Sequence, residues 1–227
     1  MKISIITTAF NSAETIADTM ESVLAQTYGD IEYIVVDGAS KDRTMDIVKA
    51  FEPRFEGRMK WISEPDCGIY DAMNKGIKAA SGDVVGTLNS DDMLASNDVV
   101  EKIVDTLLRS GAGCAYGRLN IVDSKNTSKI LRESNTGQYK TGAFLKGWHP
   151  AHPTFYTYKK FFEKFGYYRT DLKIAADFEL MMRFIIRSNL EIINAFKLNG
   201  IRPPLLCVPR KILPKLANTL KNKFLRK

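Results

Sequence analysis

The chain has 227 residues, which is enough for one α/β domain with a substantial core. Hydrophobic residues make up 44% of it and charged residues 26%, as in ordinary globular proteins. No uninterrupted apolar run reaches the ~20 residues that a membrane-spanning helix needs. The first apolar stretch ends by Asn11 and is too short for a secretory signal, so we expect a cytoplasmic protein. The cysteines Cys67, Cys114 and Cys207 are odd in number and widely separated, which argues against a disulfide framework or a zinc site.

The net charge of +7 is concentrated at the C-terminal end of the chain. Residues 210–227 contain seven Lys or Arg and no acid, whereas the rest of the chain is balanced. A neutral body argues against a nucleic-acid partner, because such proteins usually spread basic charge over a folded face. From Pro214 onward, Leu216, Leu220 and Phe224 recur at helical spacing. This pattern favours a basic amphipathic helix on an anionic membrane surface over a partly frayed, solvated tail.

Strand and helix patterns alternate through the first 95 residues. Short apolar runs predict strands at residues 3–8, 31–36, 60–62 and 84–88. Helical spacing of apolar residues predicts helices around residues 16–24, 47–51 and 70–80. Asn11 and Glu14 have the form of a capping box, and Ser40 is an expected cap for the second helix. The alternation predicts a doubly wound, mostly parallel central sheet flanked by helices.

Two adjacent carboxylates, Asp91 and Asp92, follow the fourth predicted strand. The carboxyl ends of strands are where open α/β sheets bind ligands. Adjacent acids repel each other, so a divalent cation that also meets phosphate oxygens would explain the pair. The alternative is an ordinary helix start, since Asp and Asn are common capping residues. A helix-start role is also open to Ser96 or Asn97.

Asp37 and Lys75 each allow two interpretations. Asp37 stands at the end of the second strand, where an acid either recognises ribose hydroxyls or stabilises the tight turn that Gly38 permits. Lys75 lies off the apolar face of its helix. Its ammonium either pairs with Asp71 one turn earlier or points at phosphate.

The second half of the chain is less regular. The patterns predict a helix at 97–109, a strand within 112–122, a polar excursion at 124–139, a strand at 155–158, a helix at 160–165 and a last strand at 190–196. Both histidines, His149 and His152, lie next to Trp148 in a proline-rich loop that cannot form a regular helix. Asp177 opens a further helix, either as a dipole-compensating acid or as a general base with apolar neighbours.

Several segments together resemble the family-two inverting glycosyltransferases of the GT-A fold. The matching segments are Ser4–Asn11, Val35–Thr44, Asn89–Asp92 and Ala176–Leu180. A further stretch, Ser63–Gly76, resembles the branch that builds bacterial O-antigens, capsules and exopolysaccharides. The resemblance covers residues 3–190, and several motifs in the right order are far more specific than any one of them. It implies a GT-A domain over 1–200, with a nucleotide-sugar half (1–95) and an acceptor half (96–200), followed by the basic tail (201–227).

The resemblance also implies roles for individual residues. Thr8, Phe10 and Asp37 would hold the nucleoside, while Asp91 would meet the ribose or the outer shell of a metal. Asp92 would ligate Mn²⁺ or Mg²⁺ on the diphosphate. Asp177 would be the catalytic base. Near the diphosphate, the metal or the acceptor, the resemblance places His152 and its neighbour Trp148. The loop from Asp66 stands where some members carry an arginine, so Asp66 and Lys75 are grouped with the donor-binding residues.

By this resemblance, the expected activity is sugar transfer from a nucleoside-diphosphate sugar, with UDP favoured. The expected acceptor is a saccharide on a polyprenyl diphosphate, used in surface-polysaccharide synthesis at the inner face of the cell membrane. The alternative is a nucleotide-sugar-binding protein of the same fold that transfers nothing. That alternative gives Asp177 no role.

Overall fold

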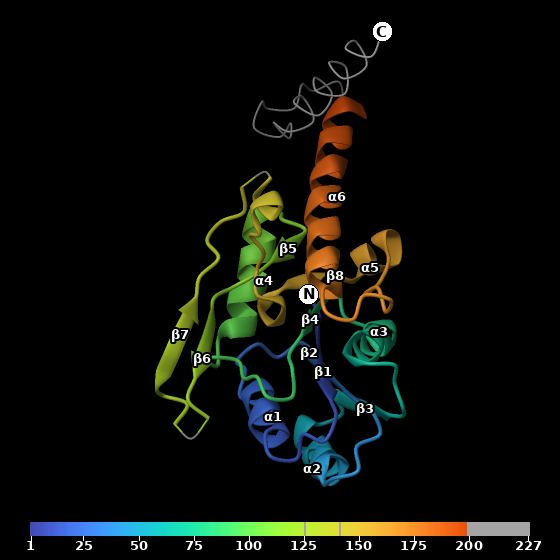
Figure 1. The fold of residues 1–227 in the computed structure, drawn as a ribbon, viewed down its shortest axis with the longest axis vertical. Helices are drawn as coiled ribbons and strands as arrows, with labels where there is room; N and C mark the ends of the chain where they lie inside the picture. Colours follow the sequence, from blue (N-terminus) through green and yellow to red (C-terminus); the bar gives the residue numbers. More distant parts are fainter. Residues whose placement is uncertain (125, 141, 199–227) are drawn as a thin grey trace.

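The fold was analysed in a computed structural model that describes residues 1–124, 126–140 and 142–198. The basic tail lies outside these residues. The main feature of the fold is a six-stranded sheet in the order β3-β2-β1-β4-β8-β5, seen in Figure 1. The strands are β1 (Ile3–Ala9), β2 (Ile31–Asp37), β3 (Met59–Ser63), β4 (Val84–Thr87), β5 (Cys114–Ala115) and β8 (Tyr156–Tyr158). The first four are parallel, and β8 runs antiparallel to β4 and to β5.

Helices cover both faces of this sheet. One core packs α1 (Ile16–Leu24), α2 (Thr44–Phe51) and α4 (Val99–Ser110) against one face. The other core packs α3 (Ile69–Ala79), α5 (Lys159–Phe165) and α6 (Ala176–Leu198) against the other face. Every residue of β1 is buried, and neighbours such as Ile5 and Ile6 belong to different cores because side chains alternate along a strand. The predicted doubly wound, mostly parallel sheet is confirmed.

The parallel strands bring their carboxyl ends to one edge of the sheet. The loops that follow β1, β2, β3 and β4 therefore meet there, as expected for an open α/β sheet. The remaining elements are short. They are the 3₁₀ turns η1 (Glu52–Phe55), η2 (Ala143–Lys146) and η3 (His152–Thr154) and a separate ribbon of β6 (Leu119–Val122) and β7 (Ile130–Ser134). This ribbon occupies part of the predicted polar excursion.

The structure corrects four local predictions. Residues 190–196 are not a strand, because α6 continues as one helix to Leu198. Asn11 caps no helix: it has a φ of 51°, and α1 begins five residues later behind Thr15. Ser40 does not cap α2 either, since its hydroxyl bonds the Asp37 carboxylate. At α4 the capping position belongs to Asp98 and has no side-chain capping bond, so Ser96 and Asn97 do not fill it.

Within the described residues, none of the helices has the length and apolarity required to cross a bilayer. This observation covers α6 as far as Leu198.

Glu32 provides a test of how the fold depends on pH. Glu32 is 7% exposed, and its carboxylate accepts hydrogen bonds from Ser4 Oγ at 2.5 Å, Ser81 N at 2.7 Å and Lys60 Nζ at 2.9 Å. Burial opposes its ionisation, but these donors outweigh burial and lower its pKa from 4.5 to about 2. A carboxylate with a lowered pKa stabilises the fold above its unfolded pKa, and this contribution disappears as the pH falls toward the folded value.

We therefore expect the unfolding free energy to fall by up to about 3 kcal/mol between pH 4.5 and 2 through Glu32 alone. Urea unfolding across this pH range should show a shallower pH dependence for Glu32→Gln than for the wild type. Glu21→Gln is the control, because Glu21 forms an exposed ion pair with Arg54. An unchanged slope in Glu32→Gln would contradict this assignment.

Candidate active site

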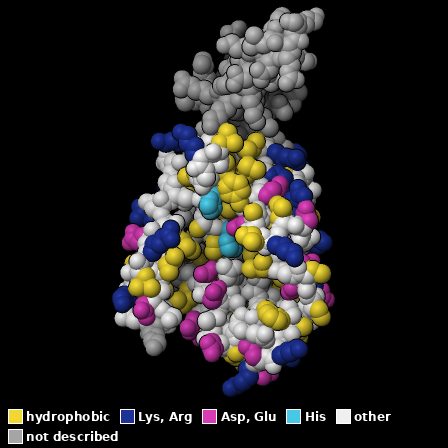
Figure 2. All heavy atoms as spheres, viewed as in Figure 1, with side chains coloured by type: hydrophobic (Ala, Val, Ile, Leu, Met, Phe, Trp, Pro, Cys, Tyr) yellow, Lys and Arg dark blue, Asp and Glu magenta, His cyan; other side chains and the backbone are white. Residues whose placement is uncertain are grey.

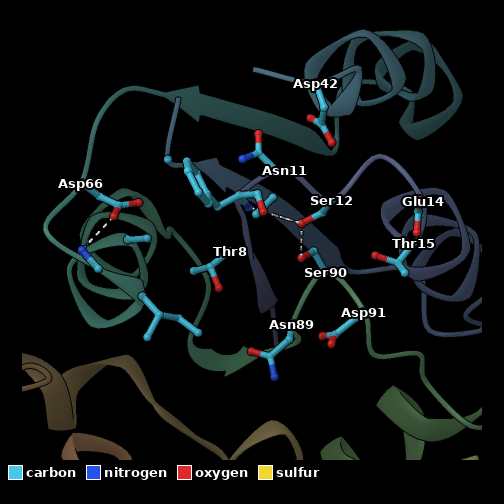
Figure 3. A pocket seen from close by; sticks show the side chains of 16 residues that line it. Thr8, Asn11, Ser12, Glu14, Thr15, Asp42, Asp66, Asn89, Ser90 and Asp91 are labelled. Carbon is cyan, nitrogen blue, oxygen red and sulfur yellow. Dashed lines mark hydrogen bonds between the residues drawn. The ribbon is translucent and has the colours of Figure 1, made fainter. Parts of the chain in front are cut away.

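A cavity of about 940 Å³ opens at the carboxyl edge of the parallel strands. It is lined from the loops after β1, β2, β3 and β4 and from the start of α3, as Figure 3 shows. The lining residues with polar side chains are Thr8, Asn11, Ser12, Glu14, Thr15, Asp42, Asp66, Asn89, Ser90 and Asp91. Phe10 also lines it and is 64% exposed, so its ring offers a face to a planar ligand. Thr8, Phe10, Asp66 and Asp91, four of the predicted donor-binding residues, thus share one cavity.

Hydrogen bonds between loops give this cavity its walls. The hydroxyls of Ser12 and Ser90 lie 2.8 Å apart and join the loop after β1 to the loop after β4, as drawn in Figure 3. Asn11 links the loops after β1 and β2, because its Oδ1 accepts from Lys41 N at 2.9 Å and its own N donates to Ser40 Oγ at 2.8 Å. These bonds hold the loops that form the polar walls of the cavity next to one another.

Asp37 does not line the cavity, although its neighbour Gly38 does. It is fully buried, and its carboxylate accepts from Ser63 Oγ at 2.6 Å and from both the hydroxyl and the backbone N–H of Ser40. These bonds tie the end of β2 to the end of β3. These contacts correspond to the interpretation in which Asp37 stabilises the turn after β2. Contact between Asp37 and a nucleoside remains a prediction.

Asp66 and Lys75 lie close to the loop after β3, but only Asp66 lines the cavity. Asp66 lines the cavity, accepts from Gly68 N at 2.8 Å, and lies so close to Gly38 that a Cβ there would come within 2.6 Å of it. Lys75 Nζ instead lies 2.8 Å from Glu64, 2.8 Å from the Pro65 carbonyl and 3.6 Å from Asp71. The structure thus contains the surface pair with Asp71, and Lys75 holds the loop that presents Asp66.

Asp91 and Asp92 separate into a cavity residue and a half-buried one. Asp91 is exposed at the cavity wall, whereas Asp92 is half-buried and accepts from Asn89 Nδ2 at 2.9 Å. Burial, with the charge of Asp91 as a second cause, raises the pKa of Asp92. Asn89 Oδ1 is a buried acceptor with no hydrogen-bond partner. Two carboxylates and an unused amide oxygen are the hard oxygen donors that Mn²⁺ or Mg²⁺ takes.

These residues alone would not complete the coordination of a metal. The described part of the chain has no group of three or more His, Cys, Asp or Glu side chains that could hold a metal ion. An ion at Asp91 and Asp92 would therefore take its other ligands from water and from a bound phosphate, as is common for Mg²⁺. The donor set fits a metal shared with a substrate.

Asp177, His152 and Tyr70 come together from distant parts of the chain. Asp177 lies in the first turn of α6, and its Oδ2 is 3.7 Å from His152 Nδ1 in η3. Its Oδ1 accepts a hydrogen bond of 3.2 Å from the Tyr70 hydroxyl in α3. Burial lowers the pKa of His152, although the negative charge of Asp177 acts in the opposite direction. His152 Nε2 is buried without a hydrogen-bond partner. The structure thus brings Asp177, His152 and Tyr70 together, a grouping that the sequence analysis did not include.

Trp148 anchors the loop that carries the histidines. Its Nε1 donates to the Thr136 carbonyl at 2.5 Å, and its ring contacts those of Tyr116, Tyr139 and Phe144 with centroids 5.3–5.7 Å apart. The indole N–H is thus already used within the protein. Figure 2 shows both histidines beside an apolar surface, with acidic side chains below them on the same face.

Tyr70, Ser12 and Ser90 were not predicted as site residues. Tyr70 lies within the predicted helix around residues 70–80, and its contact with Asp177 spans 107 positions, which no local pattern reveals. The available signal for Tyr70 was its place in the Ser63–Gly76 stretch, which carries part of the family resemblance.

The sequence matches the family described as Glycosyl transferase family 2 over residues 4–185. The chain belongs to this family. It is 36% identical over 188 residues to an uncharacterized glycosyltransferase of Mycobacterium tuberculosis (strain H37Rv), covering 80% of this chain and 68% of that protein. It is 30% identical over 183 residues to a PGL/p-HBAD biosynthesis glycosyltransferase of the same strain, covering 79% of this chain and 68% of that one.

Solved structures confirm the GT-A fold of this glycosyltransferase domain. S. aureus TarS 1–349 in complex with UDP-GlcNAc superposes with a TM-score of 0.68 at 19% identity, covering 82% of this chain and 54% of that one. The mannosyltransferase PcManGT from Pyrobaculum calidifontis, in complex with GDP-Man and Mn²⁺, gives a TM-score of 0.60 at 20% identity, covering 92% and 58%. The chain spans little more than half the length of these structures.

Proposed function

We propose that this protein is an inverting glycosyltransferase that uses a nucleoside-diphosphate sugar, with UDP as the nucleotide. The observation that supports the proposal is the hydrogen bond between Asp177 and Tyr70, a residue in the helix turn that borders the cavity. Ile69 and Ala72 line the cavity, and Tyr70, which lies between them on α3, bonds Asp177. A donor in the cavity would therefore present its sugar toward a carboxylate that can accept a proton.

In the proposed reaction, an acceptor hydroxyl oxygen attacks the anomeric carbon of the donor sugar. A carbon–oxygen bond forms as the bond from that carbon to the diphosphate oxygen breaks, and the electron pair leaves with the nucleoside diphosphate. Asp177 takes the proton of the attacking hydroxyl. A single displacement from the opposite face inverts the anomeric configuration. A positioned general base is typically worth about 10²–10⁴ in rate.

The charge of the cavity supports metal dependence. Four acids line it, Glu14, Asp42, Asp66 and Asp91, and the described lining includes no Lys or Arg. A diphosphate is itself anionic, so it needs positive charge that these side chains do not provide. Asp92, Asp91 and the Asn89 amide oxygen would hold Mn²⁺ or Mg²⁺ there, and the ion would act as a Lewis acid on the diphosphate. His152 Nε2, which is buried and has no hydrogen-bond partner, would donate a hydrogen bond to the diphosphate.

The choice of UDP rests on the likeness to TarS, whose structures were determined with UDP and with UDP-GlcNAc. The exposed ring of Phe10 would stack on the base, while Thr8 and Asp66 would contact the nucleoside from the other walls. Turnover of a panel of UDP-, GDP- and dTDP-sugars, with Mn²⁺ and with a chelator, tests the proposal. Metal-dependent release of UDP supports it, whereas binding without turnover would favour the alternative of a non-catalytic nucleotide-sugar-binding protein.

For the acceptor we propose a saccharide on a polyprenyl diphosphate, used in bacterial surface-polysaccharide synthesis. The basic residues of 210–227 would hold the enzyme at the inner face of the membrane, each Lys or Arg adding about 1 kcal/mol near anionic lipid.

Removing residues 210–227 should therefore abolish co-sedimentation with vesicles that contain anionic phosphatidylserine. The full-length chain should bind these vesicles but not neutral phosphatidylcholine vesicles. Binding that survives the truncation would contradict the proposed role of the tail.

A further inference from the structure

Asp177 is held in place by α3, the helix whose first turn borders the donor cavity. Its Oδ1 accepts the hydrogen bond from Tyr70 at 3.2 Å. The same phenol oxygen lies 3.0 Å from the carbonyl of Ile174, three residues before Asp177. Tyr70 therefore contacts both the carboxylate and the backbone that leads into it.

Asn74, one turn after Tyr70 on α3, holds the segment that precedes α6. Asn74 is 8% exposed, and its Nδ2 donates to the Tyr168 carbonyl at 2.9 Å while its Oδ1 accepts from Tyr168 N at 2.9 Å. The ring of Tyr168 stacks on Tyr70 with centroids 5.6 Å apart and planes at 19°. Asn74 and Tyr168 thus hold the phenol of Tyr70 in the position from which it reaches Asp177.

The two oxygens of Asp177 consequently have different surroundings. Oδ1 is occupied by Tyr70, whereas Oδ2 faces His152 Nδ1 at 3.7 Å, which is too long for a hydrogen bond. Oδ2 has no hydrogen-bond donor within range among the described residues, so it is the better placed of the two oxygens to accept a proton from a substrate hydroxyl. The titratable groups that face the carboxylate are Tyr70 from α3, His152 from η3 and Tyr168 from the segment before α6.

From these contacts we infer that Tyr70 is a positioning residue for Asp177: it occupies Oδ1, directs Oδ2 toward the acceptor hydroxyl, and couples the base to the donor cavity through α3. The inference rests on the proposed function, in which Asp177 is the base. Tyr70 itself does not line the cavity, although Ile69 beside it does. Its effect should therefore fall on the chemical step and leave donor binding intact.

Tyr70→Phe tests this, because it removes only the hydroxyl and keeps the ring that stacks on Tyr168. We expect kcat for hydrolysis of UDP-GlcNAc, or of whichever UDP-sugar turns over fastest, to fall about 10-fold, since misplacing a catalytic group has costs of this order or larger. The donor KM should stay within about 2-fold. A fall in kcat at a constant KM would place the role of the hydroxyl in the chemical step and not in donor binding.

Tyr28→Phe is the matched control, since its hydroxyl donates 2.7 Å to the Met1 carbonyl at a place away from Asp177. It should leave kcat and KM unchanged. An unchanged kcat in Tyr70→Phe would overturn the inference, and so would a donor KM that rises as kcat falls, because a general loss of the site's structure predicts that result. Retained turnover in Asp177→Asn would instead overturn the proposed function, so the two failures are distinguishable.

Discussion

Asp177→Asn should reduce sugar transfer at least about 100-fold, because an amide cannot accept the proton of the attacking hydroxyl. The substitution keeps the shape of the side chain and an oxygen that can still accept from Tyr70. Affinity for UDP should remain within about 2-fold of the wild type, since Asp177 is not among the residues that line the cavity. Initial-rate assays and calorimetric titration with UDP measure the two quantities separately.

Asp171→Asn provides the matched control for this experiment. Asp171 lies six residues before Asp177, ahead of α6, and forms an exposed ion pair with Arg169. Its replacement should leave transfer unchanged. Near wild-type transfer by Asp177→Asn would show that the proton goes elsewhere and would remove the basis for assigning a base at α6.

Asp92→Asn should reduce metal-dependent turnover about 100-fold or more, because it removes a charged oxygen from the proposed metal site. The same change should not weaken the fold. A carboxylate whose pKa is raised on folding opposes the folded state at neutral pH, and the replacing amide oxygen can still accept from Asn89. The melting temperature should therefore stay constant or rise while activity falls, as is common where a site trades stability for function.

The control for Asp92→Asn is Asp105→Asn, which breaks an exposed pair with Arg109 on α4. Its turnover and its response to added Mn²⁺ should match the wild type. Full activity of Asp92→Asn across a Mn²⁺ titration would exclude this carboxylate from the metal site. A lower melting temperature would show that its charge serves the fold.

The nucleotide half of the fold could be predicted from sequence because its signals are local. Each parallel strand is a short apolar run that ends in turn residues, so β1, β2, β3 and β4 were found within one or two residues. The acids at the ends of such strands were correctly expected at one edge of the sheet. Their individual environments were not predictable, since burial of Asp37 depends on Ser63 from another strand.

The second half was harder because its elements are specified by distant contacts. Residues 190–196 contain Ile192 and Ile193, which favour a strand locally, yet the helix that begins at Ala176 runs through them. Tyr70, His152 and Asp177 come together because β8 pairs antiparallel with β4 and because α3 and α6 pack in the same core on one face of the sheet. The spacing of residues along the sequence does not reveal these long-range contacts.

The anomeric configuration of the first product tests the proposed chemistry most directly. Proton NMR of UDP-α-GlcNAc, or of another UDP-α-sugar that the protein turns over, can follow the released sugar before it mutarotates. A single displacement assisted by Asp177 gives the β-anomer first. Initial appearance of the α-anomer would contradict a single displacement and the role of Asp177 as its base.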